Sequence, residues 1–241
     1  MDPILIVKTG TTLASLASEH GDFEDWIRAG MGLDRNQMTV VPVFEGIDLP
    51  DPKRFAGVVV TGSGAMVSHR EPWSERTAEW LRDALECTTP VLGICYGHQL
   101  LAHALGGRVG PNPHGREIGT VRVQLTPEAA DDALLAGFGG ALLVHTTHSE
   151  AVLELPKPAV RLASSKSDPN SAFSFGTAAW GVQFHPEFDA HVMKRYIEER
   201  RELLVAEDID ADDRLSGVEE SPDGTRVLRR FRELLSGRVK T

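Results

Sequence analysis

Residues 90–99 read Pro-Val-Leu-Gly-Ile-Cys-Tyr-Gly-His-Gln, and this stretch decides the expected fold. A short apolar run leads into a Gly-x-Cys-x-Gly turn, and a helical pattern follows at once. This is the cysteine form of the nucleophile elbow, in which a buried strand turns sharply into a helix. Gly93 and Gly97 are needed because side chains there would collide with neighbouring elements. The pattern therefore predicts that Cys95 lies at the carboxyl end of a sheet, where the helix N-terminus favours its thiolate.

Short apolar runs rich in β-branched residues surround this turn. They occupy residues 4–7, 39–44, 57–61, 90–94, 120–125, 141–144, 160–163 and 179–184. The early runs are apolar throughout, which is typical of strands buried on both faces of a parallel sheet. Helical patterns at 22–31, 72–86 and 97–105 alternate with them. We therefore predict an α/β fold with a largely parallel central sheet flanked by helices, and an antiparallel extension within 119–184.

The C-terminal part has a different composition, which predicts a helical extension. We expect residues 1–190 to form the main domain and 191–241 to pack on it. Residues 188–205 are charged and helical, and 225–235 form a last amphipathic helix. The carboxylate-rich run at 207–213 indicates a solvated linker between them.

Composition excludes several classes of protein. The 241 residues carry a net charge of −10, and the pI near 5.4 gives no electrostatic footprint for nucleic acid or a membrane surface. The two cysteines, Cys87 and Cys95, form neither a disulfide framework nor a zinc signature. No signal peptide or apolar membrane span is present, so we expect a cytoplasmic protein.

A thiolate nucleophile needs a base, and His185 is the candidate. The segment Gly181-Val-Gln-Phe-His-Pro-Glu187 ends a predicted strand at His185, and Pro186 keeps the backbone extended. In extended backbone, residues i and i+2 point to the same side. Glu187 can then bind one imidazole nitrogen and aim the other at the sulfur of Cys95. These three residues together predict a Cys-His-Glu triad.

Acyl-transfer chemistry also needs donors that stabilise an oxyanion. One predicted donor is the backbone N–H of Tyr96, the residue after the nucleophile. We assign the second to the backbone of Ser63, in the small-residue loop Gly62-Ser63-Gly64 that follows the strand at 57–61. A phosphate-binding loop is the rival interpretation, but the Lys-Ser/Thr of a Walker motif is missing.

A metal site is a weaker hypothesis. His145 and His148 lie three residues apart on a predicted strand, so their imidazoles face opposite sides, which is poor for chelation. We expect His148 to line the active-site pocket and His145 to pack in the interior. Cys87 lies near the end of a helix without any motif and is predicted to pack as well.

The two motifs at 93–99 and 181–187 resemble those of the class I glutamine amidotransferases, in the family's order and spacing. The similarity is greatest to the amidotransferase domain of GMP synthase and its stand-alone relatives. The resemblance implies a flavodoxin-like fold and hydrolysis of the glutamine side-chain amide through a γ-glutamyl thioester, without metal or organic cofactor. In it, Cys95 is the nucleophile, His185 the general base and acid, and Glu187 its orienting partner. The resemblance also supports the oxyanion role of Ser63 and Tyr96, and it places Gly62, Gln99, Glu117 and His148 at the bound substrate.

The function stays open between two enzymatic hypotheses. The chain has no adenylating or phosphate-binding motif. The ammonia would therefore pass to a separate synthetase subunit or be released. The alternative is a stand-alone hydrolase of γ-glutamyl peptides or γ-glutamyl amines, because the scissile bond is the same. A non-catalytic binding module is the third hypothesis, and the complete triad argues against it. We expect a small-molecule substrate, no nucleic acid or membrane partner, and consider a homodimer possible.

Overall fold

In a computed structural model of the chain, residues 2–237 are described. The strands are β1 (Ile4–Lys8), β2 (Met38–Pro42), β3 (Gly57–Val60), β4 (Val91–Ile94), β5 (Arg108–Pro111), β6 (Glu117–Leu125), β7 (Ala141–His148), β8 (Glu150–Glu154), β9 (Val160–Ser164), β10 (Ala172–Phe175) and β11 (Ala179–Val182). The α-helices are α1 (Ala14–His20), α2 (Phe23–Met31), α3 (Pro72–Glu86), α4 (Tyr96–Ala104), α5 (Ala190–Glu199), α6 (Arg201–Ala206), α7 (Ala211–Ser216) and α8 (Pro222–Gly237). Short 3-10 helices are η1 (Arg35–Gln37), η2 (Val43–Glu45), η3 (Pro52–Arg54), η4 (Val67–His69) and η5 (Pro127–Ala130).

Within residues 2–237, nine strands form one sheet in the order β2-β1-β3-β4-β11-β10-β9-β6-β7. The first five strands in this order are parallel, and the remaining ones pair antiparallel. A second, two-stranded sheet joins β5 and β8. The predicted α/β fold with a parallel central sheet is confirmed, and the antiparallel extension expected in 119–184 is present as β6, β7, β9 and β10.

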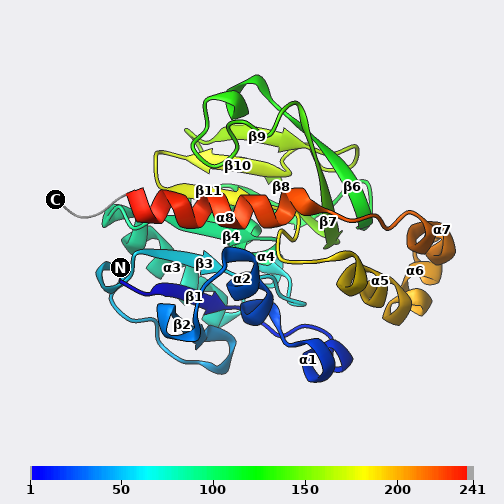
Figure 1. Cartoon of the computed structure of the whole chain (residues 1–241), viewed down its shortest axis with the longest axis horizontal. Helices are drawn as coiled ribbons and strands as arrows, with labels where there is room; N and C mark the ends of the chain where they lie inside the picture. Colours follow the sequence, from blue (N-terminus) through cyan, green and yellow to red (C-terminus); the bar gives the residue numbers. More distant parts are fainter. Residues whose placement is uncertain (1, 238–241) are drawn as a thin grey trace.

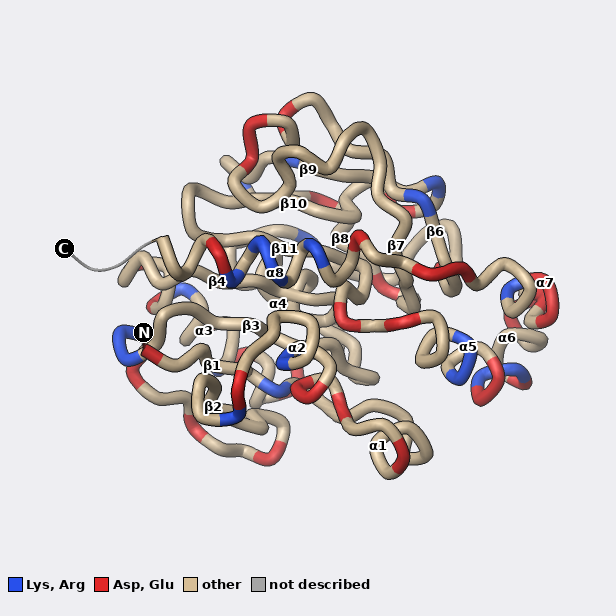
Figure 2. Tube along the Cα trace, viewed as in Figure 1, with Lys and Arg blue, Asp and Glu red and all other residues tan. Residues whose placement is uncertain are grey.

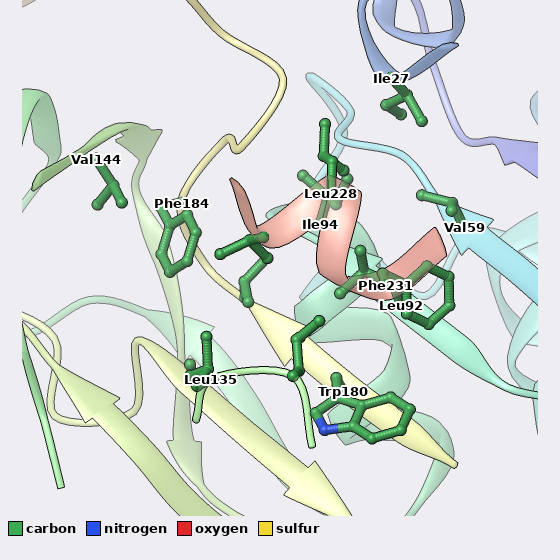
Figure 3. Close-up of a cluster of buried hydrophobic side chains, with 14 of the residues drawn as sticks. Ile27, Val59, Leu92, Ile94, Leu135, Val144, Trp180, Phe184, Leu228 and Phe231 are labelled. Carbon is green, nitrogen blue, oxygen red and sulfur yellow. The ribbon is translucent and has the colours of Figure 1, made fainter. Parts of the chain in front are cut away.

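Strand β1 shows why the parallel strands are apolar on both faces. Its residues Ile4 and Ile6 belong to one buried cluster, and Leu5 and Val7 belong to another on the opposite face. The first cluster includes side chains of α2 and α8, which lie side by side across one face of the sheet (Figure 1). Figure 3 shows Leu228 and Phe231 of α8 packed with residues of the sheet and of α2. Helices α3 and α4 cover the other face.

The C-terminal segment, which we define as residues 190–216, differs from its prediction in two ways. The expected helix at 188–205 is broken at Arg200, where α5 ends and α6 begins. The expected linker at 207–213 is wrong, because α7 begins at Ala211 with Asp210 as its N-cap. Apolar side chains between the carboxylates explain the difference, since Ile209, Ala211 and Leu215 pack in a third buried cluster with α5.

Charged residues of both signs occur along α5, α6 and α7 (Figure 2). Helix α8, by contrast, belongs to the main core, because Val227, Leu228, Phe231 and Leu235 are buried. The division of the chain at residue 190 stays a prediction, and residues 238–241 of the expected extension lie outside the described residues. In the part of the chain that the structure describes, no helix is both long and apolar enough to cross a membrane.

Candidate active site

Three neighbouring parallel strands bring the predicted motifs together. Strand β4 lies between β3 and β11, with Val60 beside Gly93 and Ile94 beside Val182. Cys95 follows β4 directly, the Gly62-Ser63 loop follows β3, and His185 follows β11. Because these strands are parallel, the three segments emerge at the same edge of the sheet. We call this edge the three strand ends.

The turn at Cys95 has the geometry of a nucleophile elbow. Cys95 has φ 51° and ψ −101°, a positive φ that non-glycine residues rarely adopt. A Cβ atom on Gly93 would come within 2.4 Å of the carbonyl oxygen of Gly97. A Cβ atom on Gly97 would come within 2.4 Å of the carbonyl oxygen of Val60. The turn therefore tolerates no side chain at either flanking position, as the sequence motif implies.

His185 and Glu187 form a buried hydrogen-bonded pair. The two atoms His185 Nδ1 and Glu187 Oε1 are 2.7 Å apart, and both side chains are almost fully buried. Phe188 stacks on the imidazole with ring centres 4.1 Å apart, and the backbone N–H of His185 donates to His145 O at 2.8 Å. These contacts hold the ring in one orientation. Cys95 Sγ lies 3.9 Å from Thr147 O, and it is close enough to His185 for each group to shift the pKa of the other, so the structure brings Cys95, His185 and Glu187 together.

The electrostatics favour a thiolate–imidazolium pair. Burial disfavours ionisation of Cys95, but the charge and hydrogen bond of His185, helped by His148, hold the pKa of the thiol below its usual range. Burial likewise disfavours the charged imidazole, but Glu187 and Cys95 raise the pKa of His185 to about 10. Each of the two groups thus stabilises the charged form of the other.

Thr9 holds the loop after β3, because its hydroxyl lies 2.9 Å from Thr61 O and 3.0 Å from Gly62 O. The Ser63 N–H belongs to the same trans peptide as the Gly62 carbonyl, so it points the opposite way, away from Thr9. Tyr96 is the first residue of α4, and its N–H has no intrahelical acceptor. Ser63 and Tyr96 both line the cavity that contains Cys95. Gly62 itself packs against the ring of His185.

A cavity of about 250 Å³ opens beside the Cys95 sulfur. It is lined by Ser63, Gly64, Ala65, Met66, Cys95, Tyr96, Gln99, Arg116, Thr147, His148, Ser149, Glu150, Arg200 and Leu203. The predicted residues Gln99 and His148 are thus at the cavity. Gln99 is held by hydrogen bonds from its Nε2 to Glu150 O at 2.7 Å and to Gln183 Oε1 at 3.0 Å.

The carboxylate of Glu117 supports His148 rather than lining the cavity. Its Oε2 lies 3.3 Å from His148 Nε2, and its Oε1 accepts hydrogen bonds from Ser165 and Ser167. Burial disfavours a charged His148, but the hydrogen bond that Glu117 accepts raises the pKa of this imidazole. The charged form of His148, which Glu117 favours, helps to lower the pKa of Cys95.

Two other buried histidines, His98 and His145, have lowered rather than raised pKa values. Burial lowers the pKa of His98 to about 3 and that of His145 to about 4, so both are neutral. His145 packs in the interior, as predicted, and hydrogen-bonds Thr120. Within residues 2–237, no group of three or more His, Cys, Asp or Glu side chains is arranged to hold a metal ion.

Sequence reasoning missed the contribution of the C-terminal segment to this cavity. Arg200 and Leu203 line it from the α5–α6 junction, and Arg116 lines it from the loop before β6. No motif marks Arg200, which is one of several charged residues in a helical stretch. Only the folding of α5 onto the end of β7 places it beside the site, where it bonds Thr147.

Comparisons with known proteins agree with this geometry. Residues 22–202 match the family model described as glutamine amidotransferase class-I. A GMP synthase (glutamine-hydrolyzing) of Porphyromonas gingivalis is 39% identical over 155 residues, which cover 64% of this chain and 29% of that protein. The chain thus matches less than a third of the length of this relative.

Two other relatives match over nearly the whole chain. Gamma-glutamyl peptidase 5 of Arabidopsis thaliana is 27% identical over 91% of this chain and 89% of that protein. The crystal structure of a glutamine amidotransferase from Thermotoga maritima superposes with a TM-score of 0.76 at 26% identity, covering 98% of both chains. The family match spans most of the chain, and the relatives share its fold. The chain therefore belongs to the class I glutamine amidotransferase family.

Proposed function

We propose that this protein hydrolyses the γ-glutamyl amide bond through a thioester on Cys95, with glutamine as a substrate. The observation that carries the proposal is the buried arrangement of Cys95, His185 and Glu187 beside a cavity with two backbone donors. The lowered pKa of the Cys95 thiol favours the thiolate nucleophile, and the pKa of His185, raised to about 10, keeps the imidazole protonated as the proton donor.

In the first half of the proposed reaction, the Cys95 thiolate attacks the γ-carbonyl carbon of the substrate. The negative charge that develops on the carbonyl oxygen is stabilised by the N–H groups of Ser63 and Tyr96, each worth roughly 10²–10³ in rate. The His185 imidazolium then donates its proton to the leaving nitrogen. The C–N bond breaks, ammonia or an amine leaves, and a γ-glutamyl thioester remains on Cys95.

In the second half, neutral His185 takes a proton from a water molecule as that water attacks the thioester. The C–S bond breaks, glutamate leaves, and the Cys95 thiolate faces the His185 imidazolium again. Glu187 holds the imidazole in place and stabilises its charged form throughout both halves. No metal or organic cofactor takes part in this scheme.

The fate of the ammonia depends on a partner. The GMP synthases that match this chain are more than three times as long as the matched part. A synthetase that accepts the ammonia is therefore part of the proposal for glutamine as substrate.

A second candidate substrate is a γ-glutamyl peptide. It is favoured by the match to gamma-glutamyl peptidase 5, which extends over 91% of this chain and so includes the C-terminal segment. That segment completes the cavity with Arg200 and Leu203. The reaction at the γ-carbonyl is the same for both candidates, and only the leaving amine differs.

The test is glutamate release by the purified protein from glutamine, a γ-glutamyl peptide and a γ-glutamyl amine. We expect turnover that is abolished in Cys95→Ala and unchanged in Cys87→Ala. Cys87 is a matched control because it follows α3, away from the cavity. Activity that survives in Cys95→Ala would contradict the proposal.

A further inference from the structure

A guanidinium group from the C-terminal segment forms part of the cavity wall. Arg200 donates a hydrogen bond from Nη1 to Thr147 Oγ1 at 3.0 Å. Its guanidinium carbon lies 5.0 Å from the centre of the Tyr196 ring, which is a cation–π contact. These two contacts hold the side chain in place, and the residue lines the same cavity as Cys95.

The charges of Glu207 and of the Cys95 thiolate act on this guanidinium, but neither group forms an ion pair with it in the described residues. Among residues 2–237, no ion pair joins Arg200 to an Asp or Glu side chain. Arg116, which also lines the cavity, differs because Glu207 accepts two of its hydrogen bonds, at 2.7 and 3.0 Å. Burial and the nearby Arg116 hold the pKa of Arg200 below its usual range, but an arginine stays protonated at neutral pH. The cavity therefore contains a half-buried cation with N–H donors to spare.

The contacts of Arg200 connect it to His185, which protonates the leaving group in the proposed reaction. Its stacking partner Tyr196 lies 4.9 Å from Phe188, centre to centre, and Phe188 stacks on His185 at 4.1 Å. In the proposed reaction, His185 protonates the leaving nitrogen, so the leaving amine lies on the His185 side of Cys95. Arg200 borders the same cavity and is connected to His185 through the rings of Tyr196 and Phe188. A different part of the wall carries the buried acidic residue Glu150, which disfavours an anion there.

We infer that Arg200 binds a carboxylate on the leaving amine, so that the preferred substrates are γ-glutamyl amino acids or peptides with a carboxylate near the scissile bond. The inference rests on the proposed hydrolysis and narrows its substrate class. A guanidinium binds a carboxylate with two parallel hydrogen bonds. The leaving group of glutamine is ammonia, which has no carboxylate for Arg200 to bind. The α-carboxylate of the glutamyl group is the other source of this chemistry, and it is common to all candidate substrates.

Two substrates that differ only in the leaving amine test the inference. They are γ-glutamylglycine and γ-glutamylmethylamide, of which only the first has a leaving-group carboxylate. We expect the wild-type protein to prefer γ-glutamylglycine in kcat/KM. Arg200→Gln is expected to lower kcat/KM for γ-glutamylglycine about 10- to 100-fold, mainly through KM, and to change it less than about threefold for γ-glutamylmethylamide.

Two further variants sharpen this result. Arg200→Lys keeps the charge but loses the planar pair of donors, so we expect it to restore only part of the preference. Arg201→Gln removes the same charge at the next residue, which is exposed and paired with Asp212 at 2.7 Å. Arg201→Gln is expected to hydrolyse both substrates as the wild-type protein does. This control distinguishes a contact between Arg200 and the substrate from an effect of the protein's net charge.

Two outcomes would overturn the inference. An equal loss for both substrates would place the guanidinium on the glutamyl α-carboxylate or in support of the fold. No change for either substrate would show that Arg200 binds neither. Calorimetric binding of γ-glutamylglycine and of γ-glutamylmethylamide to Cys95→Ala, with and without Arg200→Gln, decides the same point without turnover. A wild-type protein that hydrolyses no γ-glutamyl substrate would overturn the proposed function, while the binding ratio would still decide the role of Arg200.

Discussion

The three strand ends and the C-terminal segment contribute to the same cavity in different ways. The strand ends supply Cys95, His185 and the loop at Ser63 from β4, β11 and β3, whose residues are all buried. The C-terminal segment supplies Arg200 and Leu203 from short helices with exposed charges of both signs (Figure 2). The difference teaches that reacting groups are held by rigid strands, whereas the wall that meets the leaving group is built on a less buried element.

The largest expected effect is on kcat, and it compares one histidine of the three strand ends with one of the C-terminal segment. His185→Ala removes the proposed proton donor and should lower kcat about 10⁶-fold, as loss of a triad base does in hydrolases. His191→Ala, on the exposed face of α5, should leave kcat unchanged. Steady-state kinetics with glutamine or a γ-glutamyl peptide measures both. Similar losses in the two variants would remove the distinction between the regions.

The next effect concerns the charge of His185. Glu187→Gln removes the carboxylate that stabilises the imidazolium, so we expect the pKa of His185 to fall from about 10 and kcat to fall about 10⁴-fold. The folded-state pKa lies above the ordinary value of 6.5. The stability that the imidazolium contributes is therefore fully present below about pH 6.5 and is lost as the pH rises through about 10. NMR titration of the His185 ring protons measures the pKa of His185 in both proteins. A pKa near 6.5 in the wild-type protein would refute the ion pair.

A smaller effect compares one glycine of each region. Gly97→Ala places a Cβ atom 2.4 Å from Val60 O, so the elbow must distort, and we expect a loss of about 2–3 kcal/mol in the free energy of unfolding. Gly217→Ala, at the end of α7, meets its nearest atom at 3.5 Å, an ordinary contact. It should change stability by less than about 0.5 kcal/mol. Urea denaturation, followed by circular dichroism, measures the free energy of unfolding of both variants. An equal loss of stability in Gly97→Ala and Gly217→Ala would contradict the argument from close packing.

The smallest effect lies in the ion pair that joins the C-terminal segment to the body of the protein. Glu207→Gln removes the partner of Arg116, but Glu207 is about one-third exposed, so we expect a loss of less than about 1 kcal/mol in the free energy of unfolding. Asp212→Asn, which breaks the exposed pair with Arg201, is the matched control and should be near neutral. A loss of several kcal/mol for Glu207→Gln would mean that the segment depends on this pair for its position.

Local patterns accounted for the elements nearest the chemistry. The strand-to-helix turn at Cys95 follows from two glycines and an apolar run, and the His185–Glu187 contact follows from extended backbone around Pro186. Other elements escaped prediction because they contain residues that are poor strand formers. Strand β5 contains Gly110 and Pro111, and β10 contains Ala172 and Ser174, so neither forms an apolar run of β-branched residues like that of β3. Both form because neighbouring strands pair with them.

The sequence by itself determined the fold class, through the alternation of apolar runs and helical patterns along the chain. It also determined the nucleophile turn and the His-Pro-Glu segment, because each depends on backbone geometry within about ten residues. Only the tertiary structure decided that β3, β4 and β11 are neighbours, that Glu117 stands behind His148, and that Arg200 reaches the cavity. These facts depend on strand pairing and burial between segments far apart in the chain. No local pattern of charge or hydrophobicity encodes which distant surface a side chain such as Arg200 will meet.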